Sequence, residues 1–223
     1  MTIADLLTTP FQWGSSLRHR KVFHPVGVLV EGAFTRTAPQ DHGLPLPTSE
    51  VIARVSKAVG MPGSLPDAVG LALRVPEGIA GPRPWDVLLV SAASNPIGRA
   101  VGLRPVLSWS DQPLTSLMPL RFEGSNWWLR ARLSNAIDGP GFALDSVRVR
   151  ITHGGLELRL DQARGAADFE PLGELRLDRL RTEGDVSFDP VRNTAPGVTL
   201  YPGWLAGLRT SAYAHSREGR DAD

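Results

Sequence analysis

Short segments in which apolar and polar residues alternate recur along this chain, with turn residues between them. Such alternation is typical of half-buried β-strands, because successive side chains of a strand point to opposite faces. The earlier segments span residues 21–37, 51–59, 69–78 and 85–92, and the later ones span residues 126–134, 145–153, 156–163 and 173–182. Short connections within each set predict antiparallel pairing. Two sets joined by a long crossover predict one closed barrel.

Helices are expected between and beyond these strands. Residues 111–120 carry a helix-start signal, with Asp111 as the N-cap and Pro113 in the first turn. A last helix, at roughly 202–216, would pack on the outside of the barrel. We therefore expect an α+β fold, a closed antiparallel β-barrel of about eight strands with flanking helices. It would form a single domain over residues 1–223.

Glycine and proline residues mark irregular points of the predicted strands. Pro25 cannot donate a ladder hydrogen bond, so the first strand lies at an edge or bulges there. Gly27 and Gly32 mark points where this strand bends, or where another group approaches its backbone closely. Gly154 and Gly155 predict a hairpin turn between two later strands.

The composition excludes several classes of protein. Apolar residues make up 42% of the chain and charged residues 21%, which supports a substantial core and argues against disorder. The net charge of +1 argues against a broad nucleic-acid-binding surface. With no cysteine there can be no disulfide, no thiolate-ligated haem and no cysteine nucleophile. We see no signal peptide and no run of ~20 apolar residues, so we expect a soluble, cytoplasmic protein without a membrane span.

The predicted last helix places an arginine and a tyrosine one turn apart. Arg209 and Tyr213 would share one face of that helix. A guanidinium beside a phenol favours the phenolate, which is a ligand for ferric iron, including haem iron. The same spacing also occurs in ordinary surface helices, where it gives a cation–aromatic contact.

Several segments, in order along the chain, resemble the haem catalase superfamily. The matching segments are KVFHPVGVLVEGAF (21–34), ARVSKAVG (53–60), PDAVGLALRV (66–75), WDVLLV (85–90) and FDPVRNTAPGV (188–198). They are similar to that family's distal-histidine stretch, arginine–aromatic–serine strand, Asp-x-x-Gly-x-Ala strand, Trp-Asp segment and Phe-x-Pro…Pro-Gly-Ile run. The Arg-x-x-x-Tyr pattern near the end of the chain, with an arginine seven residues after the tyrosine, completes the resemblance. It covers nearly the whole chain and implies a small catalase-like peroxidase with haem b.

The resemblance also implies a role for each matching residue. His24 matches the distal histidine, which would move a proton from the inner to the outer oxygen of a hydroperoxide. Tyr213 matches the iron ligand, and Arg209 matches the arginine that keeps this tyrosine ionised. Ser56 matches a serine that orients the histidine. The basic residues that match propionate-binding positions are Lys21, Arg54 and Arg220.

The chain departs from the family pattern in ways that bear on its substrate. A typical catalase subunit is much longer, and Lys21 stands where arginine is usual. Alignment on Asp86 puts Val90 at the place of the distal asparagine, and Asn95 follows several residues late. Loss of that asparagine weakens the orientation of hydrogen peroxide, and we expect organic hydroperoxides to be preferred. The amino-terminal arm that helps to lock catalase tetramers is missing, so we expect a homodimer.

The expected partners are therefore a hydroperoxide and a small-molecule reductant, with no nucleic acid. Two alternatives stay open: a haem enzyme that rearranges hydroperoxides or acts in biosynthesis, and a barrel that carries haem or a lipid without chemistry. Other polar side chains receive no role, because neither a carboxylate pair nor metal-ligand spacing is visible. They are Glu31, Asp67, Asp86, His19, His42, His153 and His215.

Overall fold

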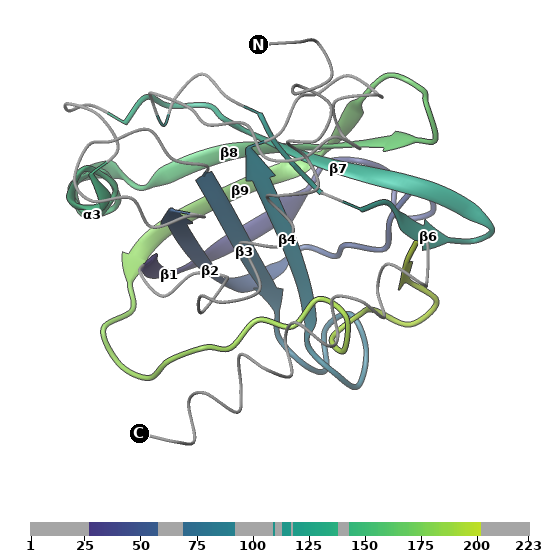
Figure 1. Ribbon diagram of the computed structural model, residues 1–223, viewed down its shortest axis with the longest axis horizontal. Coiled ribbons are helices and arrows are strands. Elements are labelled where there is room, and N and C mark those ends of the chain that lie inside the picture. The colour runs from purple at the N-terminus through teal and green to yellow at the C-terminus, as the bar shows by residue number, and fades with distance from the viewer. Residues whose placement is uncertain are drawn as a thin grey trace, which may run out of the picture.

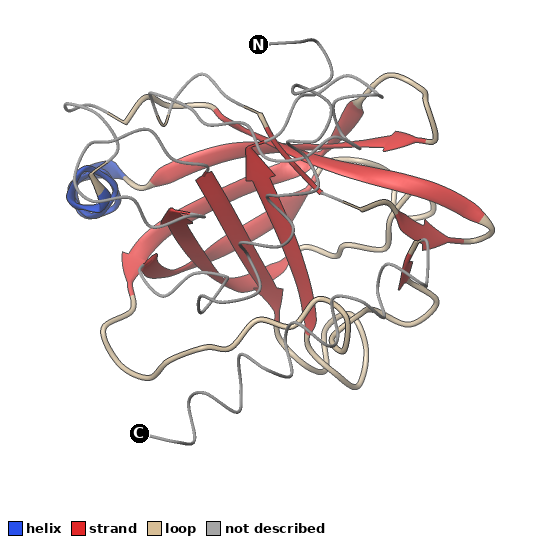
Figure 2. Ribbon diagram, in the orientation of Figure 1, coloured by secondary structure: helices blue, strands red, loops and turns tan. Residues whose placement is uncertain are grey.

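The computed structural model describes residues 27–57, 69–91, 109, 113–116, 118–137 and 143–201. In chain order the elements are β1 (Gly27–Arg36), β2 (Ser49–Lys57), β3 (Val69–Val75), β4 (Trp85–Ser91), β5 (Leu114–Ser116), β6 (Leu120–Phe122), β7 (Ser125–Leu133), α3 (Leu144–Gly154), β8 (Leu156–Arg164), β9 (Glu170–Leu180) and β10 (Thr199–Leu200). This part of the chain is mostly β, with one short helix beside the strands (Figures 1 and 2). None of its helices is long and apolar enough to cross a membrane.

Eight of the strands close into an antiparallel barrel. Strands β1 to β4 form a meander in which each strand pairs with the next. The ring continues through β5, β7, β8 and β9, and β9 pairs back onto β1 (Figure 1). Strand β6 pairs with β7 outside this ring, and β10 pairs with β6. The predicted closed antiparallel barrel of about eight strands is therefore confirmed.

The barrel interior is filled by the apolar side chains that alternate along its strands. One interior row runs from Val28 through Val55 and Leu71 to Leu89, which are partners in the β1–β4 ladders and are all buried. Gly173 leaves room for the ring of Phe34, because a Cβ added there would lie 2.5 Å from that ring. The interior is thus a packed core, as is usual for a barrel of this size.

Residues 145–153, predicted as a strand, form the helix α3. Their apolar residues alternate, but Val147 and Ile151 are also four residues apart, and these are the buried ones. Val149 is 57% exposed, so the helical period and not the strand period describes the burial. The predicted hairpin turn at Gly154 and Gly155 is also wrong. Gly155 ends the helix with a positive φ of 79° and donates its N–H to the carbonyl of Ile151.

The helix predicted at residues 111–120 is replaced by the short strand β5. Leu114–Ser116 pairs with β4 on one side and β7 on the other, and so closes the ring. Pro113 stands immediately before this strand, where its missing N–H costs no ladder hydrogen bond. Tertiary pairing has overridden a local capping signal here. The other expected helix, at roughly 202–216, lies outside the part that the structure describes.

The loop 37–48 packs against the barrel and buries Leu44 and Leu46. The Arg36 guanidinium holds this loop by donating hydrogen bonds to the main-chain carbonyls of Ala38, Pro39, His42, Leu44 and Leu46. Burial lowers the pKa of Arg36 from its ordinary value, and the nearby Asp41 acts in the opposite direction. A single arginine therefore satisfies several carbonyls that a turn-rich loop leaves unpaired.

Candidate functional site

Two of the predicted site residues, Arg54 and Ser56, lie in the described part of the chain. Both are on β2, two residues apart, and therefore point to the same face of the barrel wall. That face is the outer one, because Val55 between them points into the core. The other predicted residues lie outside the described ranges: Lys21, His24, Arg209, Tyr213 and Arg220.

Ser56 belongs to an outer row of small side chains that crosses five strands. The row consists of Gly27, Ser56, Gly70, Val90 and Thr115, which are successive partners in the ladders from β1 to β5. Ser56 is 1% exposed, and its hydroxyl contacts the carbonyl of Gly70 at 3.4 Å. Val90 and Thr115 are also buried. The register thus places the beginning of β1 directly beside Ser56, and Val90 in the same row.

Arg54 lies across Gly27. A Cβ on Gly27 would be 2.8 Å from Cγ of Arg54, so only glycine lets the arginine stem cross β1 this closely. The sequence predicted a bend or a close approach at Gly27, and the approach is confirmed. The guanidinium pairs with Asp185 and lies 5.5 Å from the centre of the Phe188 ring. The Arg54 side chain is 13% exposed, whereas Asp185 is 69% exposed.

Asp185 and Phe188 belong to a segment that follows β9, here called the docked segment (residues 185–198). Figure 1 shows it as the yellow-green trace that leaves β9 and runs toward β6 and β10. Besides the contacts with Arg54, it touches Arg74 on β3, whose guanidinium lies 5.3 Å from the Phe188 ring centre. Arg74 also donates to the carbonyl of Ser187 at 2.7 Å.

Asp86 on β4 connects the docked segment to the barrel. Its carboxylate is 0% exposed and accepts two hydrogen bonds of 2.6 Å from Arg74. The same carboxylate accepts from the main-chain N–H of Asp189 and from Nδ2 of Asn193, both at 2.7 Å. The Asp86 N–H in turn donates to the Asn193 carbonyl at 2.9 Å. This buried carboxylate therefore joins β3, β4 and the docked segment through charge-assisted hydrogen bonds.

The arrangement around Arg54 fits a ligand that carries carboxylates. A mostly buried guanidinium faces an exposed carboxylate, so a ligand carboxylate could replace Asp185 without uncovering a new charge. A haem propionate is such a group. Arg54 would hold it. The family resemblance predicts Lys21 and Arg220 as the other basic residues that bind propionates.

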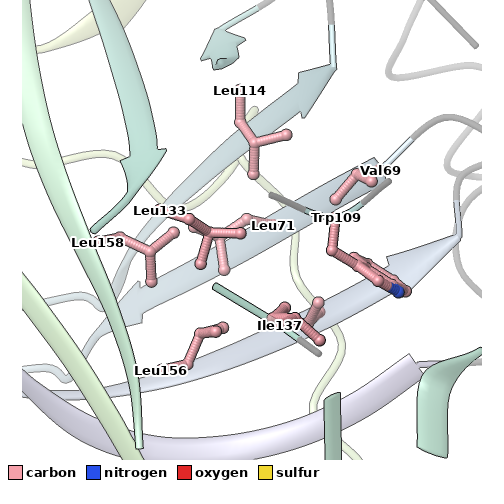
Figure 3. Close-up of a pocket in the computed structure, with 9 residues that line it drawn as sticks. Val69, Leu71, Trp109, Leu114, Leu133, Ile137, Leu156 and Leu158 are labelled. Atoms are coloured by element: carbon pink, nitrogen blue, oxygen red, sulfur yellow. The ribbon is translucent and has the colours of Figure 1, made fainter. Parts of the chain in front are cut away.

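A small cavity inside the described part of the barrel is lined by apolar side chains, among them Val69, Leu71, Trp109 and Leu133 (Figure 3). The space open to the centre of a water-sized sphere is about 20 Å³, enough for roughly one water molecule. This cavity is therefore far too small to hold a haem.

A second polar cluster links the loop 37–48 to β8 and β9. His42 Nε2 lies 2.7 Å from Oε1 of Glu170, and Nε2 of Gln162 donates to that same oxygen at 3.2 Å. Oε1 of Gln162 accepts from the Leu44 N–H at 2.9 Å. No sequence signal pairs His42 with a carboxylate so distant in the chain. This cluster fastens the loop to the barrel.

Within the part that the structure describes, no group of three or more His, Cys, Asp or Glu side chains is placed to hold a metal ion. Compared with models of known protein families, with curated proteins and with solved structures, the chain matches none of them.

Proposed function

We propose that this chain is a haem-dependent peroxidase that reduces organic hydroperoxides. The observation that carries the proposal is the outer row on β1 to β5. In that row Gly27, three residues after His24, lies opposite Ser56, the residue proposed to orient the histidine. The adjacent Arg54 has the burial and charge that a propionate requires.

In the proposed reaction, haem, His24 and Ser56 have separate roles. Bound haem supplies the iron at which the O–O bond is reduced. His24 takes a proton from the inner oxygen of the hydroperoxide and returns it to the outer oxygen. Ser56 holds the imidazole in orientation. Two electrons from a small-molecule reductant and two protons complete the conversion to an alcohol and water.

The carboxy-terminal residues would hold the iron of the haem. Tyr213 would provide the phenolate ligand, and Arg209 would keep the phenolate ionised. Arg54, Lys21 and Arg220 would neutralise the propionates and so orient the group.

Val90 supports a preference for organic hydroperoxides. It lies two strands from Ser56 in the same outer row, is 3% exposed, and occupies the position at which the resemblance predicts an asparagine. An apolar side chain there offers no hydrogen bond to hydrogen peroxide but favours contact with an alkyl substituent.

The test is hydroperoxide turnover by the haem-loaded protein, with cumene hydroperoxide and hydrogen peroxide compared at equal concentration. We expect faster reduction of cumene hydroperoxide, and a loss of roughly 10²–10⁴-fold in His24→Gln because general acid–base catalysis is removed. Product analysis without reductant is the control for rearrangement. Turnover that is absent or unchanged in His24→Gln would favour a carrier barrel, and a rearranged product would favour the biosynthetic alternative.

A further inference from the structure

Among the residues that the structure describes, two groups of the docked segment contact Arg54 from outside the barrel wall. Asp185 pairs with its guanidinium and Phe188 lies against it. The position of Arg54 is therefore tied to the position of a segment that is more than a hundred residues away in the sequence. What fixes this segment also fixes the arginine.

The docked segment is fixed by a turn within it, and this turn donates hydrogen bonds to the Asp86 carboxylate. Within the turn, Oδ1 of Asp189 accepts from the N–H groups of Val191 and Arg192 at 3.2 and 3.1 Å, and the Asn193 N–H donates to the Asp189 carbonyl at 2.9 Å. This local order presents the Asp189 N–H and the Asn193 amide together to the Asp86 carboxylate. Two anchors on one buried carboxylate hold the segment against β4.

Arg74 completes the connection from Asp86 to Arg54. It is bound to both oxygens of Asp86, and its guanidinium lies against the same Phe188 ring as that of Arg54. Each arginine contributes a cation–π contact to this ring. Asp86, Arg74 and Phe188 thus form a continuous chain of contacts that ends on Arg54.

We infer that Asp86 is a positioning residue: through the docked segment and Arg74 it holds Arg54 in place to bind a carboxylate of the ligand. The inference rests on the proposed function, because it takes the ligand to be haem and the carboxylate to be a propionate. We expect Asp86 itself to contact neither the haem nor its propionates. Its effect should appear in the binding of carboxylates as well as in the stability of the fold.

The first experiment is limited trypsin digestion of the ligand-free protein, with cleavage after Arg192 followed by mass spectrometry. Arg192 is 64% exposed but lies in the anchored turn. In Asp86→Asn the side chain no longer accepts from all its donors, so we expect cleavage there to become at least roughly tenfold faster, in proportion to the population of the open segment. Cleavage after Arg164 on β8 serves as the internal reference.

Asp161→Asn is the matched control. Asp161 is also a buried outer-face aspartate with two arginine partners, but these lie on β7 and none of its hydrogen bonds reaches the docked segment. We expect this variant to leave the rate after Arg192 unchanged. If Asp86→Asn does not fold, Asn193→Ala removes one anchor outside the barrel and should accelerate the same cleavage to a smaller extent. Equal rates in the wild type and in every anchor variant would overturn the inference.

The second experiment compares the dissociation constants of haem and of haem dimethyl ester, which lacks free carboxylates. The wild type should bind haem more tightly than the ester. Asp86→Asn should reduce this preference by roughly tenfold, since a charge-assisted hydrogen bond is lost, and Asp161→Asn should not. In an Arg54→Ala background, Asp86→Asn should have no further effect on the preference.

The outcomes separate the inference from the proposed function. If haem binds and Asp86→Asn keeps the full preference for haem over the ester, the inference is wrong and the haem proposal stands. If no form binds haem, the proposed function fails and the inference fails with it, even when the trypsin result shows that Asp86 anchors the segment.

Discussion

Asp86 and Asp161 are the same residue type in the same kind of place, a buried position on the outer wall of the barrel, and they serve different purposes. Asp161 accepts hydrogen bonds of 3.0, 2.7 and 3.0 Å from Arg130 and Arg132 of the neighbouring strand. Asp86 pairs with Arg74 of its neighbouring strand, and also with Asp189 and Asn193 of the docked segment. One carboxylate secures a strand pair, and the other joins the barrel to a segment beyond it.

The difference shows how a buried charge acquires a role beyond stability. The partners of Asp161 are already held by the β7–β8 ladder, so its ion pairs add to a contact that the backbone makes anyway. The docked segment is not part of the closed ring, and Asp86 supplies its polar attachment to β4. A buried ion pair is weak evidence for stability. The role of Asp86 follows instead from the hydrogen bonds that it accepts from the docked segment.

Replacing each aspartate by alanine should produce the largest difference between the two regions. Asp86→Ala leaves Arg74, which is 19% exposed, without its carboxylate, and it leaves two donors of the docked segment without an acceptor. We expect a loss of about 3–5 kcal/mol in the free energy of unfolding. Asp161→Ala should lose less, about 1–3 kcal/mol, because it deprives only Arg130 and Arg132 of a partner and leaves no donor of another segment without an acceptor. Urea unfolding measures both, and equal losses would contradict the comparison.

Removing both members of a pair should sharpen the contrast. In Asp161→Leu/Arg130→Met the buried charges on the barrel wall are replaced by apolar side chains, and most of the lost stability should return. In Asp86→Leu/Arg74→Met the Asp189 N–H and the Asn193 amide still lack an acceptor, so a deficit of about 1–3 kcal/mol should remain. The readout is again the urea midpoint. Full recovery in the second double variant would show that the segment does not depend on Asp86.

The smallest effect is expected at the edge of the Asp161 cluster. Arg132 is 48% exposed and shares one carboxylate oxygen with Arg130. Arg132→Ala should cost less than about 1 kcal/mol, as is usual for an exposed ion pair, and the cost should shrink further in 1 M salt. Thermal unfolding at low and high salt measures this. A loss of stability as large as that of Asp161→Ala would contradict this prediction, because it would mean that Arg132 supplies most of the stabilisation in the Asp161 cluster.

Most of the barrel could be predicted from the sequence, because one-sided burial imposes alternation on β2, β7 and β9. Strands β3 and β4 are buried on both faces and read instead as short apolar runs. The errors come from places where alternation fits a second structure. Val147, Val149 and Ile151 satisfy the strand period, yet the pair with a spacing of four is buried and the segment is a helix. The strand β5 could not be recognised, because three residues carry too little pattern and its pairing depends on β4 and β7.

The candidate site could be predicted only where a motif named it. The resemblance singled out Arg54 and Ser56, and the ladders put both on one face beside Gly27. The resemblance predicted no partners for Asp86 and Arg74, because their pairing depends on the β3–β4 register and on the docking of a segment that follows β9. The pairing of His42 with Glu170 was hidden for the same reason.

The proposed function depends on haem binding through Tyr213, which can be read from the visible absorption spectrum of the purified, haem-reconstituted protein. We expect a Soret band together with the charge-transfer bands of a ferric phenolate, and we expect those charge-transfer bands to be lost in Tyr213→Phe. The absence of a haem spectrum after reconstitution, or a spectrum unchanged in the Tyr213→Phe variant, would contradict the account.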